Sequence, residues 1–279
     1  MKMEYRRLDN GDTEQVTAFL LRDPVMNVVL LSNTARFGLE QGESPFHADC
    51  FGGWGESGLQ AVGALYNIGA FFFHADSTES MSGMARCIAG LGRVPAYTAG
   101  TRGQVATFLE ELSALVPVTP ELIESVYMVL RDEVSDVPRA GEARAATPDD
   151  LDVMVSMQAD FELEAFGKTV VEEESLQRLL AYQVGEGGAT VVEVHGRVVS
   201  KAEATVAESH CALVGGVYTL PEWRGKGYST TCMGALCRSL LSRVPAVGLN
   251  VFVENHSARR VYEKTGFDVV EDWLTVEMA

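Results

Sequence analysis

The loop between a predicted strand and the helix after it holds the residues with the clearest chemistry. The segment Val214–Met233 reads as a β-strand that ends near Pro221 and an amphipathic helix. The loop between them combines two cations with two glycines: Arg224, Gly225, Lys226 and Gly227. Glycine lets the backbone bend and approach a ligand closely, and the N–H groups and dipole of a helix start favour an anion. The loop therefore predicts binding of a phosphate or pyrophosphate.

Two common phosphate loops do not fit this segment. A Walker A loop needs Gly-Lys-Ser/Thr, but Gly225-Lys226 is followed by Gly227. A dinucleotide fingerprint needs a third glycine where Thr230 stands.

Two blocks of sequence resemble motifs of the GCN5-related N-acetyltransferases (GNAT). The loop resembles motif A, Q/R-x-x-G-x-G/A, with serine in place of the last glycine or alanine. The segment Leu249–Phe267 resembles motif B, and the residues that match it are Asn255, Ser257, Ala258, Tyr262, Gly266 and Phe267. The resemblance covers Arg144–Ala279, and it extends to the first half only in the order of elements.

The resemblance implies a CoA site. In the family the loop amides hold the CoA pyrophosphate, and here that role passes to Arg224, Gly225, Lys226, Gly227, Tyr228 and Ser229. The backbone of the preceding strand would bond the pantetheine arm at Val217, Tyr218 and Thr219. Asn255 and Ser257 would lie near the cofactor, but both could instead cap the helix that follows them.

The family usually transfers an acetyl group from acetyl-CoA directly to an amine, without a metal. By resemblance Tyr262 is the acid that protonates the leaving thiolate, since a phenol with a pKa of roughly 10 carries a proton at neutral pH. A core aromatic is the alternative for Tyr262. The candidate base is Glu203, for which an exposed strand position is the alternative.

Two functions follow from these residues. The first is an acyl-CoA-dependent N-acyltransferase acting on a small-molecule amine or on an amino group of a protein. The second is a non-catalytic acyl-CoA-binding regulatory module. The phenol of Tyr262 favours the enzyme.

The elements around the loop predict an α/β fold. The polar segment Asp132–Glu142 reads as a linker between two domains, 1–135 and 142–279. The second domain begins with a strand at 144–146, a helix capped by Thr147 and a second helix at 172–184. Three strands, a helix, a strand and a short helix follow, and a hairpin of 267–270 and 273–278 closes the chain.

The first half gives a vaguer series in the same order. We expect tandem GNAT-like domains, each a mixed, mostly antiparallel sheet flanked by helices, with a degenerate first copy. The stretch that would match the loop, Phe72–Ser77, has no glycine and carries an acid, so we expect no CoA binding there. This half would shape the acceptor pocket, with Asn27, Asn33 and Arg36 either contacting the acceptor or lying as solvated helix positions.

Composition limits the partners and the location. The 279 residues carry a net charge of -17, which argues against nucleic acid as a partner. No run approaches the roughly 20 apolar residues of a membrane span, and the first residues lack the apolar run of a secretory signal, so we expect a cytoplasmic protein without membrane contact. Five scattered cysteines without a CxxC predict neither disulfides nor zinc. The closing hairpin could pair across a homodimer.

Overall fold

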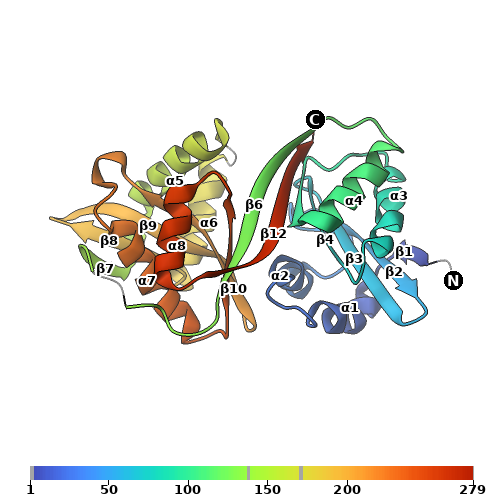
Figure 1. Cartoon of the computed structure of the whole chain (residues 1–279), viewed down its shortest axis with the longest axis horizontal. Coiled ribbons are helices and arrows are strands. Elements are labelled where there is room, and N and C mark those ends of the chain that lie inside the picture. The colour runs from blue at the N-terminus through green and yellow to red at the C-terminus, as the bar shows by residue number, and fades with distance from the viewer. Residues whose placement is uncertain (1–2, 137–138, 170–171, 279) are drawn as a thin grey trace. The chain divides into compact units, whose positions relative to one another are not determined.

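The computed structural model describes residues 3–136, 139–169 and 172–278, and the chain divides into two compact units (Figure 1). The first unit contains Met1–Tyr127, Phe252–Glu254 and Glu271–Ala279, and the second contains Met128–Val251 and Asn255–Val270. No helix in the described ranges is long and apolar enough to cross a membrane.

The first unit is a mixed sheet with helices. Its strands are β1 (Glu4–Arg7), β2 (Ala48–Gly55), β3 (Gly58–Tyr66), β4 (Ala70–Ala75), β5 (Tyr97–Thr101), most of β6 (Pro120–Leu130) and most of β12 (Asp268–Met278). Its helices are α1 (Thr13–Leu20), α2 (Val28–Phe37), α3 (Ser82–Ala89) and α4 (Arg102–Ser113). The sheet runs in the order β1-β2-β3-β4-β5-β12. These neighbours are antiparallel except for the parallel pair β4 and β5.

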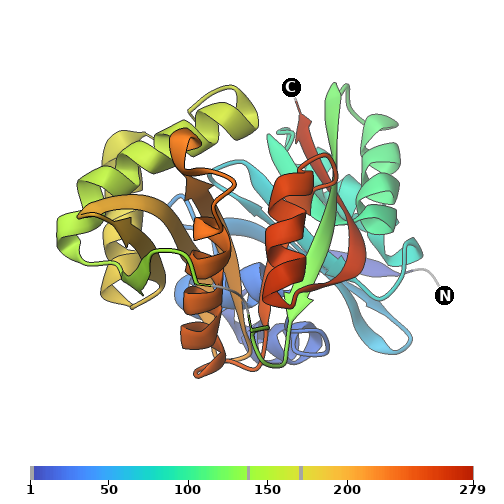
Figure 2. The ribbon, with the colours of Figure 1, turned by 60° about the vertical axis from the view of Figure 1, so that its left-hand side comes forward.

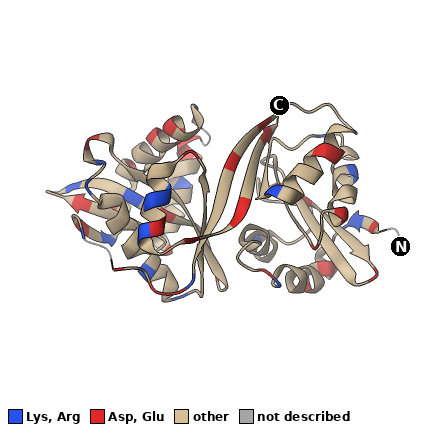
Figure 3. Ribbon diagram, viewed as in Figure 1, with Lys and Arg blue, Asp and Glu red and all other residues tan. Residues whose placement is uncertain are grey.

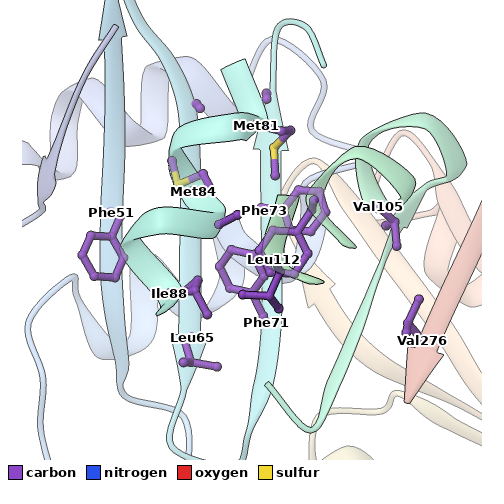
Figure 4. Close-up of a cluster of buried hydrophobic side chains, with 14 of the residues drawn as sticks. Phe51, Leu65, Phe71, Phe73, Met81, Met84, Ile88, Val105, Leu112 and Val276 are labelled. Atoms are coloured by element: carbon purple, nitrogen blue, oxygen red, sulfur yellow. The ribbon is translucent and has the colours of Figure 1, made fainter. Parts of the chain in front are cut away.

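Strand β4 shows how this sheet buries both faces. Successive side chains of a strand point to opposite faces. Phe71 and Phe73 accordingly enter a cluster with apolar residues of α3 and α4 (Figure 4), whereas Phe72 packs against the cluster that α1 and α2 cover. Strand β4 therefore packs against apolar side chains on both of its faces, more deeply on the face of Phe71 and Phe73.

The last strand of the chain completes the first unit. Residues Trp273–Glu277 of β12 pair antiparallel with β5, and Leu274 and Val276 are buried in the cluster under α3 and α4. The predicted hairpin of 267–270 and 273–278 is therefore wrong, because the chain stays extended from Asp268 to Met278. Asp272 can occupy a turn, but Glu271-Asp272 include no glycine for a left-handed angle, and the residues that follow pair with β5.

The second unit holds the motif-bearing segments (Figure 2). Its strands are β7 (Glu142–Ala145), β8 (Ala189–Val194), β9 (Arg197–Glu208), β10 (Cys211–Thr219) and β11 (Val247–Phe252), with α5 (Leu151–Phe166), α6 (Glu173–Gly185), α7 (Tyr228–Leu241) and α8 (His256–Thr265). The sheet order is β11-β10-β9-β8-β7. Only β10 and β11 are parallel among the pairs of this order. The predicted class, a mixed and mostly antiparallel sheet flanked by helices, is confirmed.

Local sequence explains where the elements of the second unit begin. Thr147 forms a capping box with Asp150, so the predicted cap is confirmed. Gly167 ends α5 in the left-handed region, with φ of +68°. Of the predicted linker, residues 132–136 and 139–141 form neither helix nor strand, and Pro138 lies outside the described residues.

Candidate active site

Helix α7 begins at the end of the glycine loop. After a 3₁₀ turn at Pro221–Trp223, Gly225 has φ of +75° and Gly227, the N-cap residue, has φ of +88°. Nothing lies within 4 Å of the position that a Cβ would take on Gly225, so the backbone angle and not space requires glycine there. No described side chain caps this helix start. The first amides of α7 are therefore oriented to meet an anion.

Strand β10, which leads into the loop, separates from β11. In the described part of the chain the two strands pair only through Ala212 with Val247 and Leu213 with Gly248. On its other edge β10 follows β9 with a register shift between Gly215 and Tyr218, where Gly216 has φ of +56°. The bulge and the separation leave the later residues of β10 without a ladder to β11 in the described chain. An extended ligand chain could pair with that backbone edge.

A buried ion pair lies against the bulge. The Lys201 ammonium donates to both carboxylate oxygens of Glu203, at 2.7 and 3.0 Å, and to the carbonyl of Gly216 at 2.9 Å. Lys201 is 0% exposed and Glu203 is 2% exposed. Burial raises the pKa of the Glu203 carboxyl, and the neighbouring Lys201 opposes that shift. The alternative reading of Glu203 as an exposed strand residue is therefore wrong.

The ion pair continues into helix α5. Lys201 also donates to Gln158 Oε1 at 2.7 Å, and Gln158 Nε2 donates to Glu162 Oε1 at 3.3 Å. Glu162 is 3% exposed. A side chain on Gly216 would collide with the Glu203 carboxylate. The bulge, the ion pair and residues of α5 thus form one polar cluster in the second unit.

The loop cations contact protein oxygens. Arg224 donates to the carbonyl of Thr219 at 2.9 Å and to both oxygens of Glu164, at 3.0 and 2.8 Å. The hydroxyl of Tyr218 donates to the same carboxylate at 2.7 Å. Burial, followed by the bond to Glu164, raises the pKa of Tyr218 to about 12. Lys226 donates to the carbonyl of Glu222 at 3.0 Å. These bonds hold the loop backbone, while both of its cations remain exposed at the surface.

Tyr262 lies in the core of the second unit. It is 8% exposed, and its ring centroid is 6.0 Å from that of Phe267. Burial raises the pKa of its phenol, so the hydroxyl is protonated at neutral pH. In the described chain no hydrogen bond joins Tyr262 to Glu203 or to the glycine loop. Both readings of Tyr262, core aromatic and acid, are compatible with this position.

Asn255 and Ser257 interact with each other at the start of α8. The Asn255 side chain accepts from the backbone N–H of Ala258 at 3.1 Å and from the Ser257 hydroxyl at 3.0 Å. Asn255, and not Ser257, is therefore the N-cap residue. Both residues are exposed, so the cap does not prevent contact with a ligand.

The sequence of the second unit matches a family model. Residues 154–267 match the acetyltransferase (GNAT) family. The chain carries a GNAT-family domain. A comparison with curated protein sequences found no match.

Solved structures extend the likeness to the whole chain. A GCN5-related N-acetyltransferase from Sphaerobacter thermophilus has a TM-score of 0.67 at 15% identity, over 99% of this chain and 95% of that one. A tandem GNAT protein from the clavulanic acid biosynthesis pathway has a TM-score of 0.58 at 15% identity, over 100% and 98%. A GNAT acetyltransferase from Colwellia psychrerythraea has a TM-score of 0.63 at 12% identity, with both chains fully covered. The predicted tandem GNAT fold is confirmed.

The first GNAT-like unit lacks the glycine loop that the GNAT-family domain has. Its segment after β4 carries Asp76, which pairs with Arg22 at 3.2 Å, and continues into a 3₁₀ turn at Glu79–Met81. The absence of CoA binding in this unit stays a prediction. Among the described residues no cluster of three or more His, Cys, Asp or Glu side chains could hold a metal.

Sequence reasoning missed four polar residues of the GNAT-family domain: Gln158, Glu162, Glu164 and Lys201. The signal for the last was present, since Lys201 and Glu203 stand two apart and share one face of a strand. The acids at 162 and 164 read as a solvated helix face. Nothing in the sequence pattern shows that β9 turns its charges inward and that α5 covers them.

Proposed function

We propose that the second unit is an acyl-CoA-dependent N-acyltransferase, which transfers acetyl from acetyl-CoA to an amine in a ternary complex. The proposal rests on one observation. The start of α7, after Gly225 and Gly227, has no described side-chain cap and follows the end of β10 that does not pair with β11. A diphosphate suits the amides at the helix start, and an amide-bearing chain suits the strand edge.

The proposed cofactor contacts follow from that geometry. The amides of residues 225–229 would hold the pyrophosphate, with Arg224 and Lys226 adding charge at its rim. The backbone of Val217, Tyr218 and Thr219 would pair with the pantetheine arm. Asn255 and Ser257, exposed at the start of α8, would contact the cofactor from the neighbouring helix.

The proposed chemistry is one acyl transfer. CoA supplies the acyl group as a thioester. The amine nitrogen bonds to the acyl carbon, the carbon–sulfur bond breaks, and the nitrogen loses a proton. We assign Glu203 as the base that accepts this proton, because burial raises the pKa of its carboxyl toward neutral pH. Tyr262 would protonate the leaving thiolate and recover its proton from solvent.

A turnover assay tests the proposal. Purified protein is incubated with acetyl-CoA and a panel of small amines and basic peptides, and free thiol is measured. We expect thiol release that depends on at least one amine and an acetylated product by mass spectrometry. CoA binding without turnover on a broad panel would instead indicate a regulatory module. If the protein does not bind CoA, both the enzyme and the regulatory module are contradicted.

A further inference from the structure

A cavity of about 310 Å³ lies in the second unit between α7 and the segment that enters β7, and none of its lining residues belongs to the bulge of β10. One wall is the segment that enters β7, with Arg139, Gly141 and Glu142, and the other is α7, with Thr231, Ala235 and Arg238. The three helix positions are four and three residues apart, so they share one face of α7. This face lies outside the glycine loop, and no step of the proposed reaction uses it.

The first wall is held in place by its backbone. The N–H of Ala140 donates to Thr231 Oγ1 at 2.8 Å. Gly141 has φ of +72°, and a Cβ there would come within 2.7 Å of Val192, so only glycine lets the segment lie this close to β8. A Cβ on Gly227 would lie 3.5 Å from Ala140. The cavity therefore borders the glycine loop.

Its charges favour an anion. Arg139 and Arg238 make no ion pair or hydrogen bond with the described part of the chain through their side chains, whereas nine other arginines pair with carboxylates there. The Arg238 guanidinium lies back over Gly234, 3.5 Å from the position of a Cβ, and so points toward the start of α7. Glu142 is the one acid among the described residues of the lining, so two cations face one carboxylate there, in a chain of net charge -17.

We propose that this cavity binds a phosphomonoester through Arg139 and Arg238. The planar guanidinium fork matches phosphate oxygens, and a dianion suits a pair of guanidinium groups. Two sources have this chemistry. One is the 3′-phosphate on the ribose of CoA, which rests on the proposed function because the cofactor must first occupy the glycine loop. The other is a separate phosphate-bearing metabolite.

Calorimetry with three probes separates the sources: CoA, 3′-dephospho-CoA and inorganic phosphate. For the first source we expect wild type to bind CoA at least tenfold more tightly than dephospho-CoA, and Arg139→Ala/Arg238→Ala to lose that preference with unchanged dephospho-CoA affinity. Glu142→Gln should tighten CoA binding, an opposite change that misfolding would not produce. For the second source, inorganic phosphate binding is lost in the double variant while CoA and dephospho-CoA bind alike.

The proposal is overturned if wild type binds CoA and dephospho-CoA equally and the double variant binds inorganic phosphate as wild type does. Both arginines are exposed, so the melting temperature of the double variant should match wild type. Should neither CoA nor dephospho-CoA bind wild type, the glycine-loop assignment fails, and the phosphate arm still decides whether the cavity is a site.

Discussion

Lys201 and Glu203 form an ion pair in which both side chains are buried. A fully buried ammonium is tolerated only because four oxygens surround it: two of Glu203, one of Gln158 and the carbonyl of Gly216. The pair therefore fixes the bulge of β10 as well as the ionisation of Glu203. If Glu203 is the base of the proposed reaction, the same two side chains determine catalysis and local stability.

Lys201→Met should lower the free energy of unfolding by about 3–5 kcal/mol, because it leaves a buried carboxylate without its partner. Urea denaturation measures the change. Arg197→Met is a matched control on the same strand: its pair with Glu222 has the same kind of contact, 2.9 Å, but is exposed, and should contribute less than about 1 kcal/mol. Equal losses in the two variants would show that burial does not strengthen the Lys201 pair.

Tyr262→Phe should reduce kcat by about 100-fold and leave the Kd of CoA unchanged, since it removes a proton donor but keeps the ring. Steady-state kinetics and calorimetry separate the two effects. The aromatic contact with Phe267 survives the change, so the melting temperature should move little. An unaltered kcat would leave Tyr262 as a core residue only.

At the scale of elements, glycines at helix ends adopt positive φ angles that side chains disfavour. Gly227→Ala should cost about 1–2 kcal/mol, because its φ of +88° disfavours any side chain, and should weaken CoA binding about tenfold as the helix start shifts. Gly167→Ala is the matched control: φ is +68° at the end of α5, with nothing within 4 Å of the new Cβ. It should lower stability similarly without affecting CoA. Equal CoA affinities in both variants would contradict the loop assignment.

The junction of β7 and α5 predicts a pH effect. Bonds from Arg144, the nearer at 2.7 Å, and then from Thr147 lower the pKa of Asp150 to about 2. An unfolded aspartate titrates near pH 4, so this stabilisation is present above about pH 4 and is lost as the pH falls toward 2. Asp150→Asn should cost about 1–2 kcal/mol at pH 7 after screening is allowed for.

Unfolding of wild type and Asp150→Asn is compared from pH 7 down to pH 2. The difference in unfolding free energy should shrink below about pH 4. Asp152→Asn, an exposed change in the first turn of the same helix, provides the control. A difference that stays constant with pH would show that Asp150 does not act through its charge.

Sequence patterns predicted the structure correctly where neighbouring residues determine it. The glycine loop, the cap at Thr147 and the 3.6-residue period of α7 each follow from a few neighbouring residues. The sequence patterns failed where a segment far away in the chain determines the local structure. Lys201 and Glu203 look like solvated strand charges until α5 covers them. Strand β12 continues through Glu271, and its later part, Trp273–Glu277, pairs with β5. The contact between Arg224 and Glu164, 60 residues apart, is of the same kind.

At the scale of the whole molecule, acidic side chains are spread over elements of both units (Figure 3). Net charge of this size keeps the protein soluble and repels anions at long range. A phosphate-bearing ligand must therefore be met by local cations and helix amides, as at the start of α7. A cationic amine is attracted by the same field, which suits the proposed acceptor.

The pairing of β12 with β5 sets an order of events during synthesis. The ribosome finishes most of the first unit about 140 residues before it makes the strand that covers Val105 and Leu112. Until β12 has left the ribosome, that apolar surface stays uncovered, which invites chaperone binding or aggregation. A chain cut after residue 270 should therefore unfold at lower temperature in its first unit, and a synthetic peptide of residues 268–279 should restore it; a truncated chain as stable as the full one would show that the final strand is dispensable.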